Sequence, residues 1–124
     1  MAKASGSTRS SVGNNVDKLY QEGKSLGITK STADLFEKAR MYGNMNNAPQ
    51  SFSKKFIDRS SQDILTFVNK QEKIANTKRS KEVRIAFEKG SESMYNAAQR
   101  KYEKRMQDVR DYASKLREIQ SNFQ

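Results

Sequence analysis

The sequence predicts an all-α fold: a small helical bundle with a long C-terminal helix and a flexible N-terminal tail. Apolar residues recur at helical intervals in most segments, and the last third of the chain carries a seven-residue apolar repeat. No segment offers a second strand with which an isolated strand would pair. A length of 124 residues leaves room for one domain, so we expect a tail over residues 1–15 and a single helical domain over residues 16–124.

Residues 2–15, AKASGSTRSSVGNN, predict the tail because they are mostly Ser, Gly, Asn, Ala and Thr. Such a composition buries too little surface to offset the entropy lost on ordering. The rest of the chain is also poor in large apolar residues. Leu, Ile, Val and Phe together make up 22 of 124 residues, which predicts a thin core.

Two short helices are expected in the first half of the domain. The first should stop at Gly27, and its apolar face comprises Val16, Leu19, Tyr20 and Leu26. For the second, Ser31 is the expected N-cap and Gly43 the expected stop, with an apolar face of Leu35, Phe36, Ala39 and Tyr42. Residues 44–50, NMNNAPQ, contain the only proline and predict a loop.

Helical spacing resumes after the loop and continues from Phe52 to Val68. Ser60 and Ser61 leave a break in this helix open, because serines can interrupt a helix or cap a new one. Residues 81–90 fit two patterns. Val83, Ile85 and Phe87 alternate as in a strand, whereas Val83, Ala86 and Phe87 suit one face of a helix. We favour a helix that ends at Gly90, since a strand has no partner here.

The heptad repeat of the last third predicts a long helix that packs along one seam. The seam comprises Tyr95, Tyr102, Met106, Val109, Ala113, Leu116 and Phe123, and Gln99 and Gln120 occupy the two polar positions within it. Three uses of the seam are open. It can form the spine of an intramolecular bundle, which we favour, associate with a second copy as a homo-oligomer, or dock another protein.

The residue types that are missing exclude much chemistry. The chain has no His, Cys or Trp, so thiol nucleophiles, imidazole bases and Cys/His zinc sites are ruled out. The carboxylate pairs Glu88/Glu92 and Asp108/Asp111 lie among basic residues. We therefore expect no enzymatic activity, no cofactor and no metal. Neither a membrane span nor a secretory signal is visible, and a cytoplasmic location is the expectation.

Most of the excess positive charge lies in two short stretches of the second half. The net charge is +10, and residues 70–105 contribute +6 of it, from eleven basic and five acidic residues. In the heptad register Arg100, Lys101 and Lys104 are expected on the face away from the seam. The candidate binding residues for nucleic acid or another acidic partner are Lys70, Lys73, Lys78, Arg79, Lys81, Arg84, Arg100, Lys101, Lys104 and Arg105.

This basic clustering has two interpretations. Lysines and arginines that neutralise phosphates bind nucleic acid with steep salt dependence and little sequence selectivity. The alternative is a solvated basic face that only keeps the protein soluble. No zinc-ligand set, RNA-binding strand signature or GxxG loop is present, so a nucleic-acid ligand would be recognised by charge and shape.

The opening MAKASGSTRSS and the short, Cys-free, Lys-rich helical body resemble small proteins encoded by bacterial viruses and mobile elements. The resemblance covers low-complexity residues and general composition, and it names no single family. It implies a stoichiometric binding protein, such as a virion or packaging component or an inhibitor of host defence of the anti-CRISPR kind.

The leading hypothesis is a non-enzymatic protein that binds nucleic acid, or a ribonucleoprotein or other complex that carries it, through the Lys/Arg surface. The alternative is a phage-encoded stoichiometric inhibitor that occludes a groove on a host nucleic-acid-guided nuclease, with Phe52, Phe56 or Tyr112 as apolar anchors. A virion or scaffolding component that self-assembles through the seam is a third possibility. No membrane partner is expected.

Overall fold

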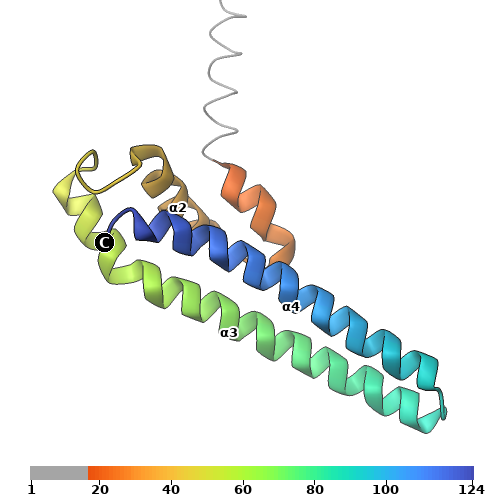
Figure 1. The fold of residues 1–124 in the computed structure, drawn as a ribbon. Coiled ribbons are helices and arrows are strands. Elements are labelled where there is room, and N and C mark those ends of the chain that lie inside the picture. Colours follow the sequence, from red (N-terminus) through yellow and green to blue (C-terminus); the bar gives the residue numbers. More distant parts are fainter. Residues whose placement is uncertain (1–16) are drawn as a thin grey trace, which may run out of the picture.

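A computed structural model describes residues 17–124, and these residues fold into an all-α bundle (Figure 1). Helical residues 17–23 continue into a short 3-10 helix, η1 (Lys24–Leu26). Three α-helices follow: α2 (Lys30–Tyr42), α3 (Gln50–Glu88) and α4 (Glu92–Ser121). The tail expected over residues 1–15 lies outside the described residues, as does Val16.

The helix ends in the first half follow the predicted glycines, but the N-cap of α2 differs. Gly27 and Gly43 end their helices at φ 90° and 87°, a left-handed region that favours glycine. The prediction of Ser31 as N-cap is wrong. Thr29 caps α2, because its backbone is extended and its side chain accepts a hydrogen bond from the Thr32 amide at 3.2 Å. Ser31 already lies inside the helix.

Helix α3 runs for 39 residues without a break and is longer than α4, which has 30. The possible break at Ser60 does not occur. Ser60 is buried, and its hydroxyl accepts a hydrogen bond from the side-chain amide of Gln120 in α4 at 2.8 Å. The Ser60 hydroxyl is thus used in a contact with α4 and caps no new helix. Residues 81–88 are helical, as favoured, and a turn through Gly90, at φ 62°, leads into α4.

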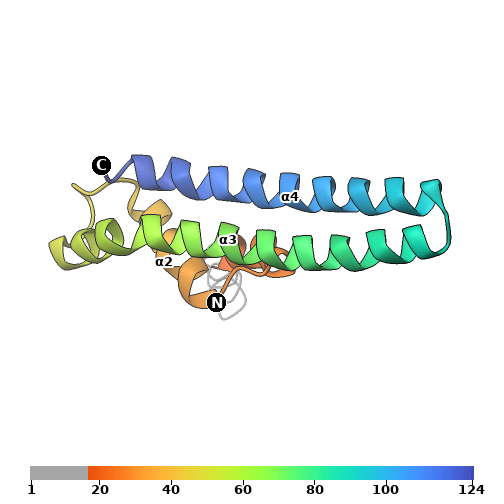
Figure 2. The same ribbon diagram turned by 90° about the horizontal axis from the view of Figure 1, so that it is seen from below.

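Helices α3 and α4 lie antiparallel and side by side along most of their length (Figures 1 and 2). Helical residues 17–23 and α2 pack on one end of this pair, and the N-terminal segment reaches its middle, where Arg105 of α4 donates to the Ser25 carbonyl (Figure 1). We call residues 17–69 and 106–124 the base, and residues 70–105, which project beyond it as a two-helix hairpin, the arm.

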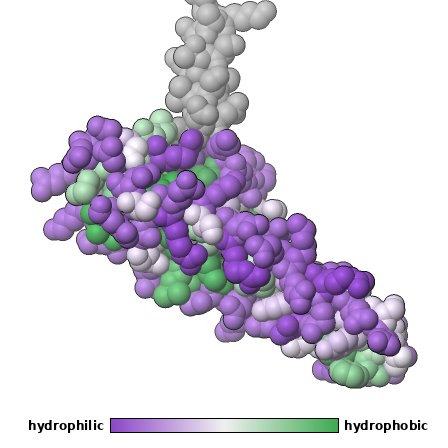
Figure 3. Space-filling view, viewed as in Figure 1, coloured by the Kyte–Doolittle hydropathy of each residue, from purple (hydrophilic) through white to green (hydrophobic). Residues whose placement is uncertain are grey.

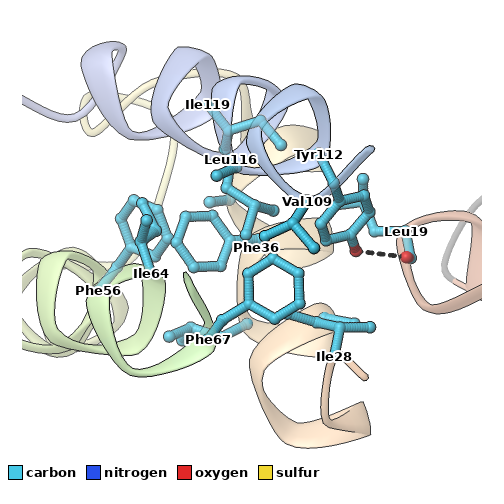
Figure 4. Close-up of a cluster of buried hydrophobic side chains, with 14 of the residues drawn as sticks. Leu19, Ile28, Phe36, Phe56, Ile64, Phe67, Val109, Tyr112, Leu116 and Ile119 are labelled. Atoms are coloured by element: carbon cyan, nitrogen blue, oxygen red, sulfur yellow. Dashed lines mark hydrogen bonds between the residues drawn. The ribbon is translucent and has the colours of Figure 1, made fainter. Parts of the chain in front are cut away.

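The base holds an aromatic core (Figure 4). The ring of Phe56 lies 5.0 Å from that of Phe36 and 4.8 Å from that of Phe123, centroid to centroid. The α4 seam faces this core, and its buried members are Met106, Val109, Ala113, Leu116 and Phe123. The seam thus serves as the spine of one chain, and pairing with a second copy along it would require opening the hairpin.

Two buried polar side chains, one from α4 and one from α2, hold residues 17–23 against these helices. The Tyr112 hydroxyl donates a hydrogen bond to the Leu19 carbonyl (Figure 4), and the Leu19 amide donates to Glu37 Oε2 at 3.3 Å. Glu37 is fully buried and also pairs with Arg40. A Cβ on Gly23 would lie 2.5 Å from the Tyr112 ring, so this helix sits directly against α4.

The Tyr112 contact predicts how stability responds to pH. Burial, followed by the carboxylates of Glu22 and Glu37, raises the pKa of Tyr112 well above its ordinary value. Because the folded pKa exceeds the unfolded one, this contribution is complete below pH of about 10 and is lost as the pH rises further. Tyr112→Phe should lower the free energy of unfolding by about 1 kcal/mol at neutral pH.

Urea denaturation of both proteins at neutral pH and above pH of about 10 checks this prediction. The loss of stability on raising the pH should be smaller in Tyr112→Phe than in the parent chain. Equal losses in the two proteins would show that Tyr112 does not carry the effect.

Candidate nucleic-acid interface

The arm combines a thin core with most of the molecule's excess positive charge. Small residues occupy its interior, where Ala75, Ala86 and Ala98 are buried between α3 and α4. Because these side chains are small, the two helices bury little of their circumference and leave their outer faces in solvent. Hydrophilic residues cover most of the visible surface of the arm, and hydrophobic residues are exposed near its tip (Figure 3).

The outer face of α3 carries a row of cations, which we call the basic row. It comprises Lys70, Lys73, Lys81 and Arg84, at intervals that place them on one helical face together with Thr77. All four cationic side chains are exposed, and none forms an ion pair or hydrogen bond with another residue of the described chain.

No acidic residue lies on this face of α3 between Lys70 and Arg84. In the same stretch α3 buries Gln71, Ala75 and Ala86, which places the row on the side of the helix away from α4. Glu82 points toward α4, where its carboxylate pairs with Lys101 Nζ at 3.2 Å. Glu88 lies one turn beyond Arg84 and ends the row.

Lys78 lies at the edge of the row rather than on it. Together with Ile74 it lines two shallow hollows, one of which runs along the groove between α3 and α4. Ile74 is half-exposed, so the edge of the row offers apolar surface beside positive charge.

Two of the predicted binding residues, Arg79 and Arg105, hold contacts within the chain. The Arg79 guanidinium lies 3.9 Å from the centroid of the Tyr102 ring and donates to Asn76 Oδ1 at 2.8 Å. Arg105 donates to the Ser25 carbonyl at 2.9 Å and to Gln71 Oε1 at 3.3 Å. The planar guanidinium groups of both arginines suit these fixed contacts. The N–H donors that make them are not available to a phosphate.

The α4 side of the arm contributes fewer unpaired cations than predicted. Lys101 is exposed, as expected, but its side chain reaches across to Glu82 of α3 and lines the groove between the helices. Lys104 pairs with Asp108 at 3.0 Å. Arg100 is exposed and has no ion-pair partner among residues 17–124. The structure thus shifts the candidate surface from both helices to α3.

The apolar anchors expected for a protein partner are placed differently from the prediction. Phe56 and Tyr112 are in the core and Phe52 is half-buried, so the first two cannot anchor a partner. Phe87, expected on an apolar face, is instead 73% exposed. Its exposure could have been inferred from the sequence, because helical spacing groups it with Ser80 and Arg84 rather than with Ala86.

Two kinds of site are absent from the described residues. Residues 17–124 contain no group of three or more acidic, His or Cys side chains that could hold a metal ion. Over the same range no helix is long and apolar enough to cross a membrane.

Comparisons with protein-family models, curated proteins and solved structures yield no match. The surface of the arm is therefore the basis for a functional proposal.

The two roles of arginine in the arm predict different effects on stability. Arg105→Ala should lower the free energy of unfolding by about 1–2 kcal/mol, because it removes one hydrogen bond that joins the arm to the base, at Ser25, and one within the arm, at Gln71. Arg100→Ala makes the same chemical change at an exposed position and should change stability by less than about 0.5 kcal/mol. Denaturation midpoints measure both, and equal effects would contradict the structural role of Arg105.

Proposed function

We propose that this chain is a non-enzymatic binding protein whose arm docks on nucleic acid, or on a protein complex that carries nucleic acid, through the basic row. The observation that carries the proposal is the row itself: Lys70, Lys73, Lys81 and Arg84 on one exposed helical face without acidic partners. A surface that served only solubility would not require cations gathered on one face with the carboxylates directed elsewhere.

The dimensions of the row suit a phosphate backbone. At a rise of 1.5 Å per residue, Lys70 and Arg84 lie about 21 Å apart along α3. A nucleic-acid strand carries one phosphate per nucleotide, so a row of this length can reach several successive phosphates. The arm extends beyond helical residues 17–23 and α2 (Figure 2). This leaves room for an extended nucleic-acid ligand along the second half of α3.

The side chains in the row favour charge recognition over base readout. Three of the four are lysines, which act as flexible point charges rather than as fixed bidentate donors. Contacts of this kind position a protein on phosphates and carry little sequence information. Binding should therefore be nonspecific in sequence and strongly dependent on salt.

The competing function is stoichiometric inhibition of a host nucleic-acid-guided nuclease, as the resemblance to small phage proteins suggests. A groove that binds nucleic acid is itself basic and would repel the row. The same cations suit the nucleic acid held by such a complex, or an acidic protein surface. Charge complementarity thus favours nucleic acid as the direct ligand.

Removing two lysines from the row tests the proposal. Lys73→Ala/Lys81→Ala should weaken binding to a labelled DNA or RNA oligonucleotide about tenfold, and the slope of log affinity against log salt should become shallower by about 2. Lys54→Ala/Lys55→Ala removes the same charge from exposed positions of the same helix in the base, and should change neither quantity appreciably. Fluorescence anisotropy across a salt series measures both.

The parent chain should lose about a hundredfold in affinity between 50 and 200 mM salt, as expected for roughly four neutralised phosphates. Equal losses in the two double variants would mean that only net charge matters and would reject the basic row as the site. Capture from a lysate with and without nuclease distinguishes the competing function, since a direct protein partner would survive the treatment.

A further inference from the structure

An exposed aromatic side chain lies at the tip of the arm, next to the end of the basic row. Phe87 is 73% exposed and follows Arg84 by three residues, which makes the two side chains neighbours on the surface of α3. A single exposed phenylalanine is ordinary on a protein surface. Phe87, however, lies next to a row of unpaired cations.

The position of the Phe87 ring is supported from one side. Its centroid lies 5.9 Å from that of Tyr95 at the start of α4, with the ring planes inclined by 52°. Tyr95 is half-buried, and its hydroxyl accepts a hydrogen bond from Gln99 at 3.3 Å. The two rings therefore form a small aromatic platform, of which Phe87 presents the exposed part.

A hollow of about 430 Å³ lies beside this platform, at the turn that joins α3 to α4. Its walls combine aromatic and polar groups: Ala86, Phe87, Gly90, Ser91, Glu92, Tyr95 and Asn96. A flat, partly apolar ligand with polar edges suits such a surface, because its faces can stack on the rings while its edges meet the hydroxyl, carboxylate and amide groups.

We propose that the tip of the arm is a stacking site for an unpaired nucleobase, so that the ligand class of this protein is single-stranded nucleic acid. This inference rests on the proposed function, because the basic row supplies the contacts to the backbone. Proteins that bind single strands combine a positively charged track with aromatic side chains on which bases stack. A duplex hides the faces of its bases and would leave Phe87 unused.

The acidic residues at the tip agree with this division of roles. Glu88 ends the basic row and Glu92 lines the hollow. Their carboxylates repel phosphates, which keeps the backbone on the row, whereas they accept hydrogen bonds from the exocyclic amino groups of bases. The charge pattern therefore directs a base, rather than a phosphate, to Phe87.

Phe87→Ala and a matched control test the stacking site. Anisotropy at one salt concentration is measured with a single-stranded DNA oligonucleotide and a duplex of equal length. Phe87→Ala should weaken binding of the single strand about fivefold or more and leave duplex binding unchanged. Leu65→Ala, which shortens a half-exposed apolar residue of α3 in the base, should change neither.

A spectroscopic variant reports on stacking directly. The chain contains no tryptophan, so Phe87→Trp places a single indole at the tip. Its fluorescence should be quenched when single-stranded oligonucleotide is added, with affinity retained, and should respond weakly to the duplex. Unchanged fluorescence at saturating single strand would reject stacking at this position.

Failure of this inference is distinguishable from failure of the proposed function. If Phe87→Ala binds the single strand as tightly as the parent chain while Lys73→Ala/Lys81→Ala weakens it, the stacking site is rejected and the basic row stands. If the parent chain binds neither oligonucleotide, both are rejected. If Phe87→Ala abolishes only the capture of a protein that survives nuclease treatment, the tip is an anchor for a protein and base stacking is rejected.

Discussion

The antiparallel pairing of α3 with α4 is the contact on which the other features of the molecule depend. In the base this pairing is filled by large side chains, and the rings of Phe56 and Phe123 meet those of α2 and the start of α3. In the arm its buried apolar residues are the alanines Ala75, Ala86 and Ala98, joined by buried Gln71 and by the Arg79–Tyr102 contact. The well-packed base can support a projecting hairpin whose own core is thin.

The thin core of the arm also leaves the exposed outer faces that the proposed binding would use. Helices that touch through small side chains bury only a narrow stripe, so each keeps a broad face for solvent or for a partner. The basic residues of the arm divide between these environments. Arg79 and Arg105 hold fixed contacts inside the structure, whereas lysines such as Lys73 and Lys81 stand on the outer face. The basic residues of the arm therefore fall into two groups: some hold contacts within the fold, and others are exposed on its outer face.

The regular features of the fold could be predicted, and the pairings between helices could not. The heptad from Tyr102 to Phe123 and the glycine stops at Gly27 and Gly43 are periodic or local signals, so the sequence carries them directly. The hydrogen bond from Gln120 to Ser60 joins residues that are distant in sequence, so spacing within α3 does not predict it. The candidate site was predicted as ten basic residues, and helical spacing does not reveal that Lys101 among them is engaged by Glu82.

The central claim is that nucleic acid lies along one face of the arm and does not spread over a generally basic molecule. Photo-crosslinking of a bound single-stranded oligonucleotide, followed by mass spectrometry of the digested protein, maps that contact without altering a residue. The account predicts crosslinked peptides from the second half of α3 and from the tip, with none from α2. Crosslinks distributed over the base as heavily as over the arm would contradict it.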